Sequence, residues 1–176
     1  MGPKTASFSG HKDCVYALCE GPSEHEFFSS GADGWVVLWN VDEPEQGKLI
    51  ARMPSSVYAL HYFPEHNLIL VGVNQDGLHL IDLNSENDIW NLPCPGVIWF
   101  RFDALDENQI LAAGSKGNLL LFNALTKSFV LLPNLNSDIR ALSVNPKNNQ
   151  VSTGSSDGSS HRTSQRNRAP CAPVKP

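Results

Sequence analysis

Residues 10–40 read GHKDCVYALCEGPSEHEFFSSGADGWVVLWN, and the prediction of the fold rests on this segment. Short apolar runs alternate in it with turns rich in Gly, Pro and Asp, a pattern typical of short β-strands. The Asp-Gly pair at 33–34 lies between two such runs and has the sequence of a tight hairpin turn. The stretch therefore predicts antiparallel strands at 14–19, 27–30 and 35–40.

The same pattern returns at intervals of 40 to 43 residues, and four sequence columns align. The first column is an apolar residue of the opening strand: Val15, Val57, Val97 and Ile139. The second is a glycine that ends the next apolar run: Gly31, Gly72, Gly114 and Gly154. The third is a turn glycine: Gly34, Gly77, Gly117 and Gly158. The fourth is a large apolar residue: Trp39, Ile81 and Phe122. Such a chain consists of equivalent units that bury their faces against their neighbours.

Each unit predicts four short strands, and we place the units at about 8–53, 54–93, 94–134 and 135–158. The pattern stops at 158, so we expect the last two strands of the fourth unit to be missing. Residues 159–176 carry four basic and no acidic side chains and lack an alternating apolar run. We expect them to form a disordered basic tail. A truncated end and a basic docking tail are the alternatives.

The composition and net charge of the chain limit the classes of partner that it is expected to bind. The net charge of −5 and the pI near 5.6 argue against a nucleic-acid partner, which would need a basic patch. No apolar run approaches the roughly 18 residues of a membrane span, so we expect no membrane association. The cysteines show no metal-ligand spacing, which predicts free thiols in a reducing compartment and no metal or other cofactor. We therefore expect a cytoplasmic protein.

The first unit resembles the WD40 repeat family of β-propellers. The residues that carry the resemblance are Gly10-His11, Ser30-Gly31-Ala32-Asp33-Gly34 and Leu38-Trp39-Asn40, with Asn40 where the family usually has Asp. The later units resemble it less closely: the second has Pro54-Ser55 in place of Gly-His and Ile81-Asp82 in place of Trp-Asp. The resemblance implies an all-β fold, a propeller of four-stranded antiparallel WD40-like blades. About three and a half blades are present, so the propeller is partial or open.

Ring closure needs typically 4–8 blades. The chain is therefore expected either to be a piece of a longer propeller or to self-associate through its open blade edges.

The resemblance also implies a buried hydrogen-bond chain in the first blade, made of Trp39, a serine, His11 and Asp33. Ser29 and Ser30 both qualify from the sequence, and we assign the role to Ser30. A hydrolase triad of histidine, serine and aspartate is the alternative. The sequence favours the structural role, because the chain has no Gly-x-Ser-x-Gly element to expose a nucleophile.

The resemblance places partner recognition on the narrow top face of the blades, next to the first column. The residues that follow this column are Tyr16, Tyr58, Ile98 and Arg140. Tyrosine and arginine are typical anchors of protein interfaces. We expect a protein or peptide to bind Tyr16, Tyr58 and Arg140, with Gln75 and Asp138 at the rim.

The predicted function is a non-enzymatic scaffold. Two alternatives remain open: a truncated propeller without independent activity, and a ligand or catalytic site in the central channel.

Overall fold

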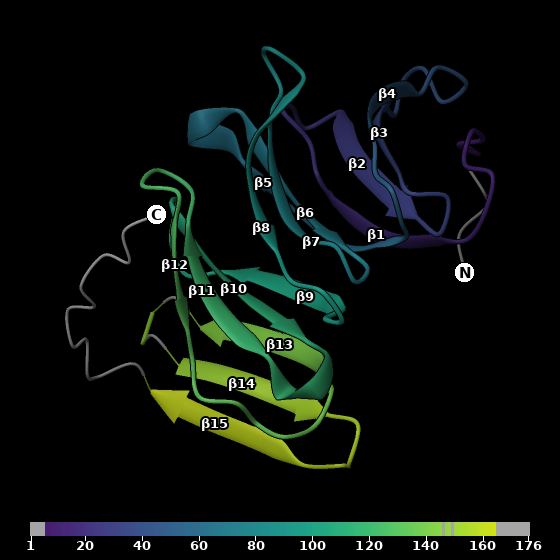
Figure 1. Cartoon of the computed structure of the whole chain (residues 1–176). Coiled ribbons are helices and arrows are strands. Elements are labelled where there is room, and N and C mark those ends of the chain that lie inside the picture. The colour runs from purple at the N-terminus through teal and green to yellow at the C-terminus, as the bar shows by residue number, and fades with distance from the viewer. Residues whose placement is uncertain (1–5, 146, 149, 165–176) are drawn as a thin grey trace. The chain divides into compact units, whose positions relative to one another are not determined.

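The computed structural model describes residues 6–145, 147–148 and 150–164. In these residues 15 strands form three four-stranded sheets and one three-stranded sheet, all antiparallel (Figure 1). Each sheet joins strands in their sequence order. This confirms the predicted all-β class, with about three and a half blades. No helix in the described ranges is long and apolar enough to cross a bilayer.

The chain divides into two compact units, residues 1–98 and 99–176. The first sheet of unit 1 contains β1 (Val15–Glu20), β2 (Glu26–Gly31), β3 (Trp35–Asn40) and β4 (Lys48–Arg52). The second contains β5 (Val57–Phe63), β6 (Leu68–Val73), β7 (Gly77–Asp82) and β8 (Asn87–Pro93), with the 3-10 turn η1 (Pro64–His66) between β5 and β6.

Unit 2 contains the two remaining sheets. The first consists of β9 (Trp99–Ala104), β10 (Gln109–Gly114), β11 (Leu119–Asn123) and β12 (Ser128–Leu131), with η2 (Ser115–Gly117) between β10 and β11. The second consists of β13 (Ile139–Asn145), β14 (Gln150–Ser155) and β15 (Ser160–Ser164).

An apolar layer joins the two sheets of unit 1. Phe28 of β2 and Val36 of β3 are fully buried in it, against Ile69 and Val71 of β6. Successive side chains of a strand point to opposite faces, so alternate residues of each strand enter this layer. Full burial of one such side chain stabilises the fold by about 1.5–3 kcal/mol. The layer therefore fixes the two blades of this unit against each other.

The fourth unit is longer than the sequence predicts. We expected no third strand, but β15 pairs with β14 from Gly154↔Ser160 to Gln150↔Ser164. The sequence of β15 is polar and has no alternating apolar pattern, so the sequence does not predict this strand. The strand can still form, because its ladder is made by backbone groups, and every residue except proline carries both a donor and an acceptor. The rest of the predicted tail, residues 165–176, lies outside the described residues.

Candidate interaction surface

The opening strand of each blade contains a β-bulge directly after its first residue. In β1, β5 and β13 the pairing skips Tyr16, Tyr58 and Arg140, respectively. A bulge leaves its extra residue out of the ladder and redirects its side chain. Three of the residues predicted to bind a partner thus share one unusual backbone position.

The third blade corrects the predicted alignment. The sequence columns align Val97 with Val15, so that Ile98 matches Tyr16. The strand starts at Trp99, and its pairing with β10 skips Phe100. Phe100 therefore occupies the bulge position. Its distance from Tyr58 is 42 residues, the same as from Tyr16 to Tyr58, and this constant step was the signal in the sequence.

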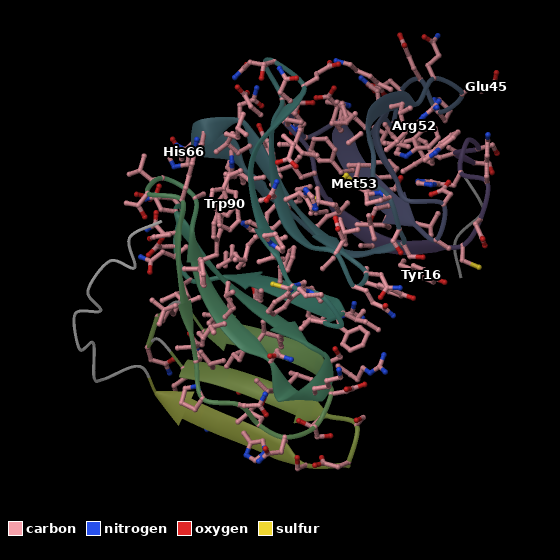
Figure 2. The ribbon with its side chains drawn as sticks, viewed as in Figure 1. Tyr16, Glu45, Arg52, Met53, His66 and Trp90 are labelled. Atoms are coloured by element: carbon pink, nitrogen blue, oxygen red, sulfur yellow. The ribbon has the colours of Figure 1, made fainter. Side chains whose placement is uncertain are left out.

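In unit 1 the two bulge tyrosines stack on each other. The ring centroids of Tyr16 and Tyr58 are 4.6 Å apart and the rings are inclined by 13°. Tyr16 is 42% exposed, so its outer face is open to a ligand (Figure 2). The pKa of Tyr16 is raised, first by desolvation and then by the nearby Tyr58, Cys14 and Asp13. The pair is an aromatic platform that presents hydroxyl groups.

Gln75 lies at the same end of the second sheet. It is exposed in the turn between β6 and β7 and has a positive φ of 59°. Next to it, the N–H of Asn74 donates to the carbonyl of Ser56 at 2.8 Å, which holds this turn beside the start of β5. The turn that carries Gln75 therefore lies beside the start of β5, the strand that carries Tyr58.

In unit 2 the bulge residues also pair. The guanidinium of Arg140 lies 3.9 Å from the ring centre of Phe100, a cation–π contact. Arg140 Nη2 also lies 3.0 Å from Asp138 Oδ2. Asp138 Oδ1 accepts a hydrogen bond of 2.8 Å from the N–H of Lys116, so it holds the η2 turn as well as the arginine. Arg140 itself remains exposed.

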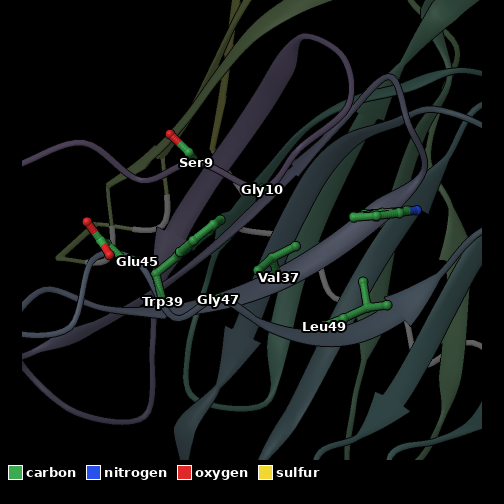
Figure 3. A pocket seen from close by; sticks show the side chains of 8 residues that line it. Ser9, Gly10, Val37, Trp39, Glu45, Gly47 and Leu49 are labelled. Atoms are coloured by element: carbon green, nitrogen blue, oxygen red, sulfur yellow. The ribbon is translucent and has the colours of Figure 1, made fainter.

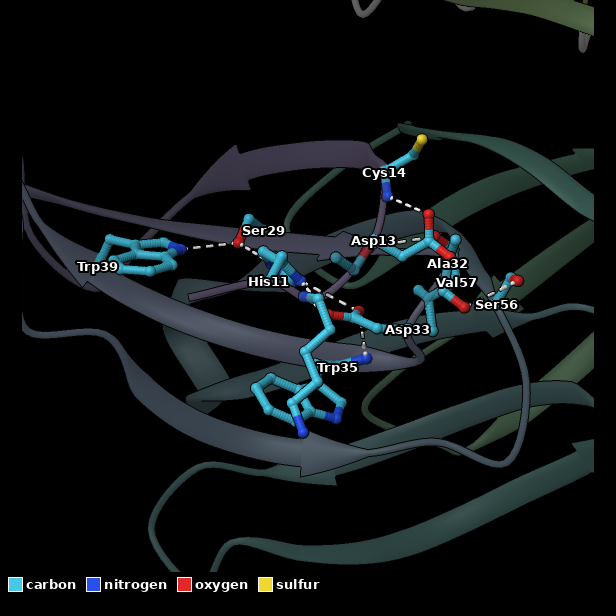
Figure 4. Close-up of polar contacts among 12 residues, drawn as sticks. His11, Asp13, Cys14, Ser29, Ala32, Asp33, Trp35, Trp39, Ser56 and Val57 are labelled. Carbon is cyan, nitrogen blue, oxygen red and sulfur yellow. Dashed lines mark hydrogen bonds and ion pairs between the residues drawn. The ribbon is translucent and has the colours of Figure 1, made fainter. Parts of the chain in front are cut away.

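The hydrogen-bond chain of the first blade is present, but with a different serine (Figure 4). His11 Nδ1 lies 2.9 Å from Asp33 Oδ2, and His11 Nε2 lies 2.7 Å from Ser29 Oγ. The indole Nε1–H of Trp39 donates to the same Ser29 oxygen at 2.7 Å. Ser30, which we had assigned to the chain, instead donates to the carbonyl of Val57 at 3.4 Å.

A neutral imidazole satisfies every partner in this chain. Nδ1–H donates to Asp33, Nε2 accepts from the Ser29 hydroxyl, and the Ser29 oxygen accepts from Trp39. Burial alone would raise the pKa of Asp33, but hydrogen bonds from the N–H groups of Lys12 and Trp35 outweigh it. The bond from His11 acts in the same direction, so the pKa of Asp33 lies below its ordinary value.

His11, Ser29 and Asp33 have the contacts of a hydrolase triad, but a substrate cannot reach the serine. Ser29 is only 3% exposed, and its oxygen is already bonded to the buried Trp39. A nucleophile must be reachable by the carbonyl that it attacks. This arrangement favours a structural role. In the described part of the chain, no group of His, Cys, Asp and Glu side chains is arranged to hold a metal ion.

A hollow of about 150 Å³ lies beside Trp39 on the outer face of the first sheet (Figure 3). Its walls include Gly10 from the segment before β1, Val37 and Trp39 from β3, and Leu49 from β4. The ring of Phe8 meets Trp39 edge-on at 5.7 Å, so the segment before β1 covers part of this face. The hollow is small for a ligand site, because such pockets usually measure 300–1,000 Å³.

Comparisons with known proteins support the WD40 resemblance. The family model "WD domain, G-beta repeat" matches residues 2–40. No curated protein matches the chain in sequence. Among solved structures, the WD40 beta propeller domain of Doa1 is similar with a TM-score of 0.78 and 17% identity, over 90% of this chain and 53% of that one.

Two computationally designed proteins have a similar structure. Ika4 has a TM-score of 0.74 and 20% identity, over 93% of this chain and 99% of that one. Ika8 has a TM-score of 0.72 and 20% identity, over 90% of this chain and 48% of that one. The chain therefore spans about half of the Doa1 domain and of Ika8. These likenesses establish the fold, that of WD40 β-propeller blades, and the predicted resemblance is confirmed.

Proposed function

We propose that this chain is a non-enzymatic WD40-type scaffold that binds a protein or peptide through the bulge residues of its opening strands. The WD40 propeller fold supports protein interaction in general. The observation that carries the proposal here is the repeated bulge, which leaves Tyr16, Tyr58 and Arg140 outside their ladders. Bulges are over-represented next to functional sites.

The side chains at these positions suit an interface. Stacked Tyr16 and Tyr58 offer apolar area with polar ends, and interface hot spots are enriched in tyrosine and arginine. Arg140 remains exposed above Phe100 and can exchange its contact with Asp138 for one with a partner. Gln75 and Asp138 are proposed as rim contacts, whose loss should change affinity less.

The partner we propose is a protein or peptide, and not nucleic acid, because the net charge is −5. The described cysteines Cys14, Cys19 and Cys94 form no disulfide with one another, and we propose a cytoplasmic location on the cysteine spacing of the sequence. A second candidate is a chain without activity of its own until another copy or another segment covers its open blade face. The exposed Leu18 on β1 favours that candidate.

The test uses peptides selected from a random library on the full wild-type chain. Their affinities are then measured for Tyr16→Ala/Tyr58→Ala, for Arg140→Ala and for the control Leu131→Ala, which removes an exposed apolar side chain of β12 away from the bulges. Truncation of a central anchor typically costs about 2 kcal/mol, roughly a 30-fold loss of affinity. We expect such a loss in the tyrosine double variant and little change in the control. Equal binding by the folded double variant would rule out this surface.

A further inference from the structure

The bulge residues of the two units differ in one chemical group. In unit 2 the guanidinium of Arg140 lies 3.9 Å from the centre of the Phe100 ring, and Asp138 pairs with it. In unit 1 the rings of Tyr16 and Tyr58 stack at 4.6 Å, and neither side chain carries a positive charge. Unit 2 therefore has a cation on an aromatic ring at its bulge positions, whereas unit 1 has aromatic rings alone.

Asp13 supplies unit 1 with a carboxylate beside the tyrosine pair. It precedes Tyr16 by three residues and is exposed. Its Oδ1 accepts a hydrogen bond of 2.7 Å from the N–H of Cys14, which fixes the carboxylate at the start of β1 (Figure 4). The pKa of Tyr16 is raised first by desolvation and then by nearby groups, of which Asp13 is one. A carboxylate has about four positions that accept hydrogen bonds, so Asp13 can also accept from a partner.

The described basic side chains of unit 1 have other partners. The unit carries four basic side chains against 13 acidic ones, and the structure describes three of the four. Lys12 and Arg52 lie over the Trp35 ring, at 4.8 and 5.1 Å from its centre. Lys48 of β4 pairs with Glu86, in the turn before β8. The surplus of acidic side chains therefore favours a cation that comes from outside the unit.

Stacking also holds the ring that such a cation would meet. One face of Tyr16 rests on Tyr58, with the two rings inclined by 13°, and Tyr16 is exposed on its other side. A side chain that is already fixed loses little conformational freedom when a partner binds, and this favours affinity. The open face of Tyr16 is therefore a prepared surface for a flat or charged group.

We propose that the Tyr16–Tyr58 pair receives an arginine of the partner peptide, whose guanidinium lies on the open face of the Tyr16 ring and donates to Asp13. This inference rests on the proposed function and names the chemistry of the partner. The contact of Arg140 with Phe100 is the model for it within the chain. Cations are attracted to the face of an aromatic ring, and arginine occurs there more often than lysine. Its planar guanidinium stacks on a ring and donates to a carboxylate, which a lysine ammonium cannot do in the same geometry.

The first measurement changes one group in the peptide. Peptides selected from a random library on the full wild-type chain are synthesised with each arginine replaced in turn by citrulline, which has nearly the same shape but no charge. We expect one of these replacements to lower the affinity about tenfold. Peptides that bind through the tyrosine pair but contain no arginine, or that tolerate every citrulline, would overturn the inference.

The second measurement asks whether Asp13 receives the arginine. Asp13→Asn removes the charge but keeps an oxygen that can accept from the N–H of Cys14. We expect this variant to bind the arginine peptide roughly fivefold more weakly than the wild type does, and the citrulline peptide equally well. A loss of the same size for both peptides would overturn the inference.

Glu45→Gln is the matched control for charge. Glu45 is exposed in the loop between β3 and β4, at the opposite end of the first sheet from Tyr16 (Figure 2). We expect this variant to bind both peptides as the wild type does. If it weakens the arginine peptide as much as Asp13→Asn does, the attraction is due to net charge and the assigned site is wrong.

The inference and the proposed function fail in different ways. If the folded Tyr16→Ala/Tyr58→Ala variant binds the selected peptides as strongly as the wild type, the interaction surface is wrong, and this inference falls with it. If the double variant loses binding while the citrulline peptides keep theirs, the surface stands and only the arginine is wrong.

Discussion

Ser29 and Ser30 are neighbours in β2, yet they have different surroundings. Side chains alternate across a strand, so only one of the two can face His11 and Trp39. Ser29 does, whereas Ser30 faces β5 and reaches the carbonyl of Val57. Both serines are buried, which makes them a matched pair for testing the hydrogen-bond chain.

We expect Ser29→Ala to destabilise the fold more than Ser30→Ala. Removal of the Ser29 hydroxyl leaves the Trp39 indole N–H and one nitrogen of His11 without their partner, which typically costs about 1–3 kcal/mol. The Ser30 bond is long, at 3.4 Å, and contributes less. Chemical unfolding of the wild type and both variants measures the difference. Equal losses would show that the chain does not stabilise this blade.

The lowered pKa of Asp33 predicts that the stability of the fold depends on pH in the acidic range. The pKa of Asp33 in the folded chain lies below its ordinary value. An aspartate in the unfolded chain titrates at about pH 4, so the stabilising effect of Asp33 is complete above that pH. The effect is lost as the pH falls through the folded pKa. We expect the wild type to have a higher melting temperature than Asp33→Asn at neutral pH. The difference between the two melting temperatures should become smaller below about pH 4. A difference of the same size at pH 3 and pH 7 would contradict this account.

Among the strands, the bulges explain why one sequence column groups Tyr16, Tyr58 and Arg140. Each bulge takes one residue out of the ladder at a fixed place in its strand, so these residues share a backbone position. The third blade was misaligned because Val97 continued the apolar column. The pairing of Trp99 with Gly114 decides the register, and no local pattern encodes a partner strand.

β15 is the strand that the sequence pattern does not predict. Its residues pair with β14 along Gly154 to Gln150, although the segment is entirely polar. We expect backbone amides of 160–164 that donate to β14 to exchange with deuterium more slowly than those of the turn at 156–158. Residue-resolved exchange on the full chain checks this. Equally fast exchange in both segments would mean that the strand is not formed in solution.

Charge is unevenly distributed along the full sequence. Residues 1–98 carry 13 acidic and 4 basic side chains, and residues 99–176 carry 5 acidic and 9 basic ones. Opposite net charges in two parts of one chain favour attraction between copies, and salt weakens such attraction. Leu18 adds an apolar contact, because this side chain of β1 is 67% exposed.

We therefore expect the chain to self-associate, and Leu18→Ser to weaken the association with little effect on stability. The exposed position of Leu18 means that serine removes apolar contact area from the surface and leaves the core unchanged. Light scattering after size exclusion, over a range of protein and salt concentrations, measures the mass. Ser143, an exposed polar residue of β13, serves as the control through Ser143→Ala. A wild type that stays monomeric at high concentration would contradict the expectation.

The repeat, the all-β class, the WD40 resemblance and the grouping of His11, Asp33 and Trp39 can all be read from the amino-acid sequence, because each depends on residue type at a regular spacing. The sequence also pointed to Tyr16 and Tyr58 before their stacking was known. Four features emerge only in the folded chain: the choice of Ser29 over Ser30, the position of Phe100 under Arg140, the strand β15 and the place of His79 between two carboxylates. These features depend on which strand lies beside which and in what register, and such contacts between distant residues leave no local pattern in the sequence.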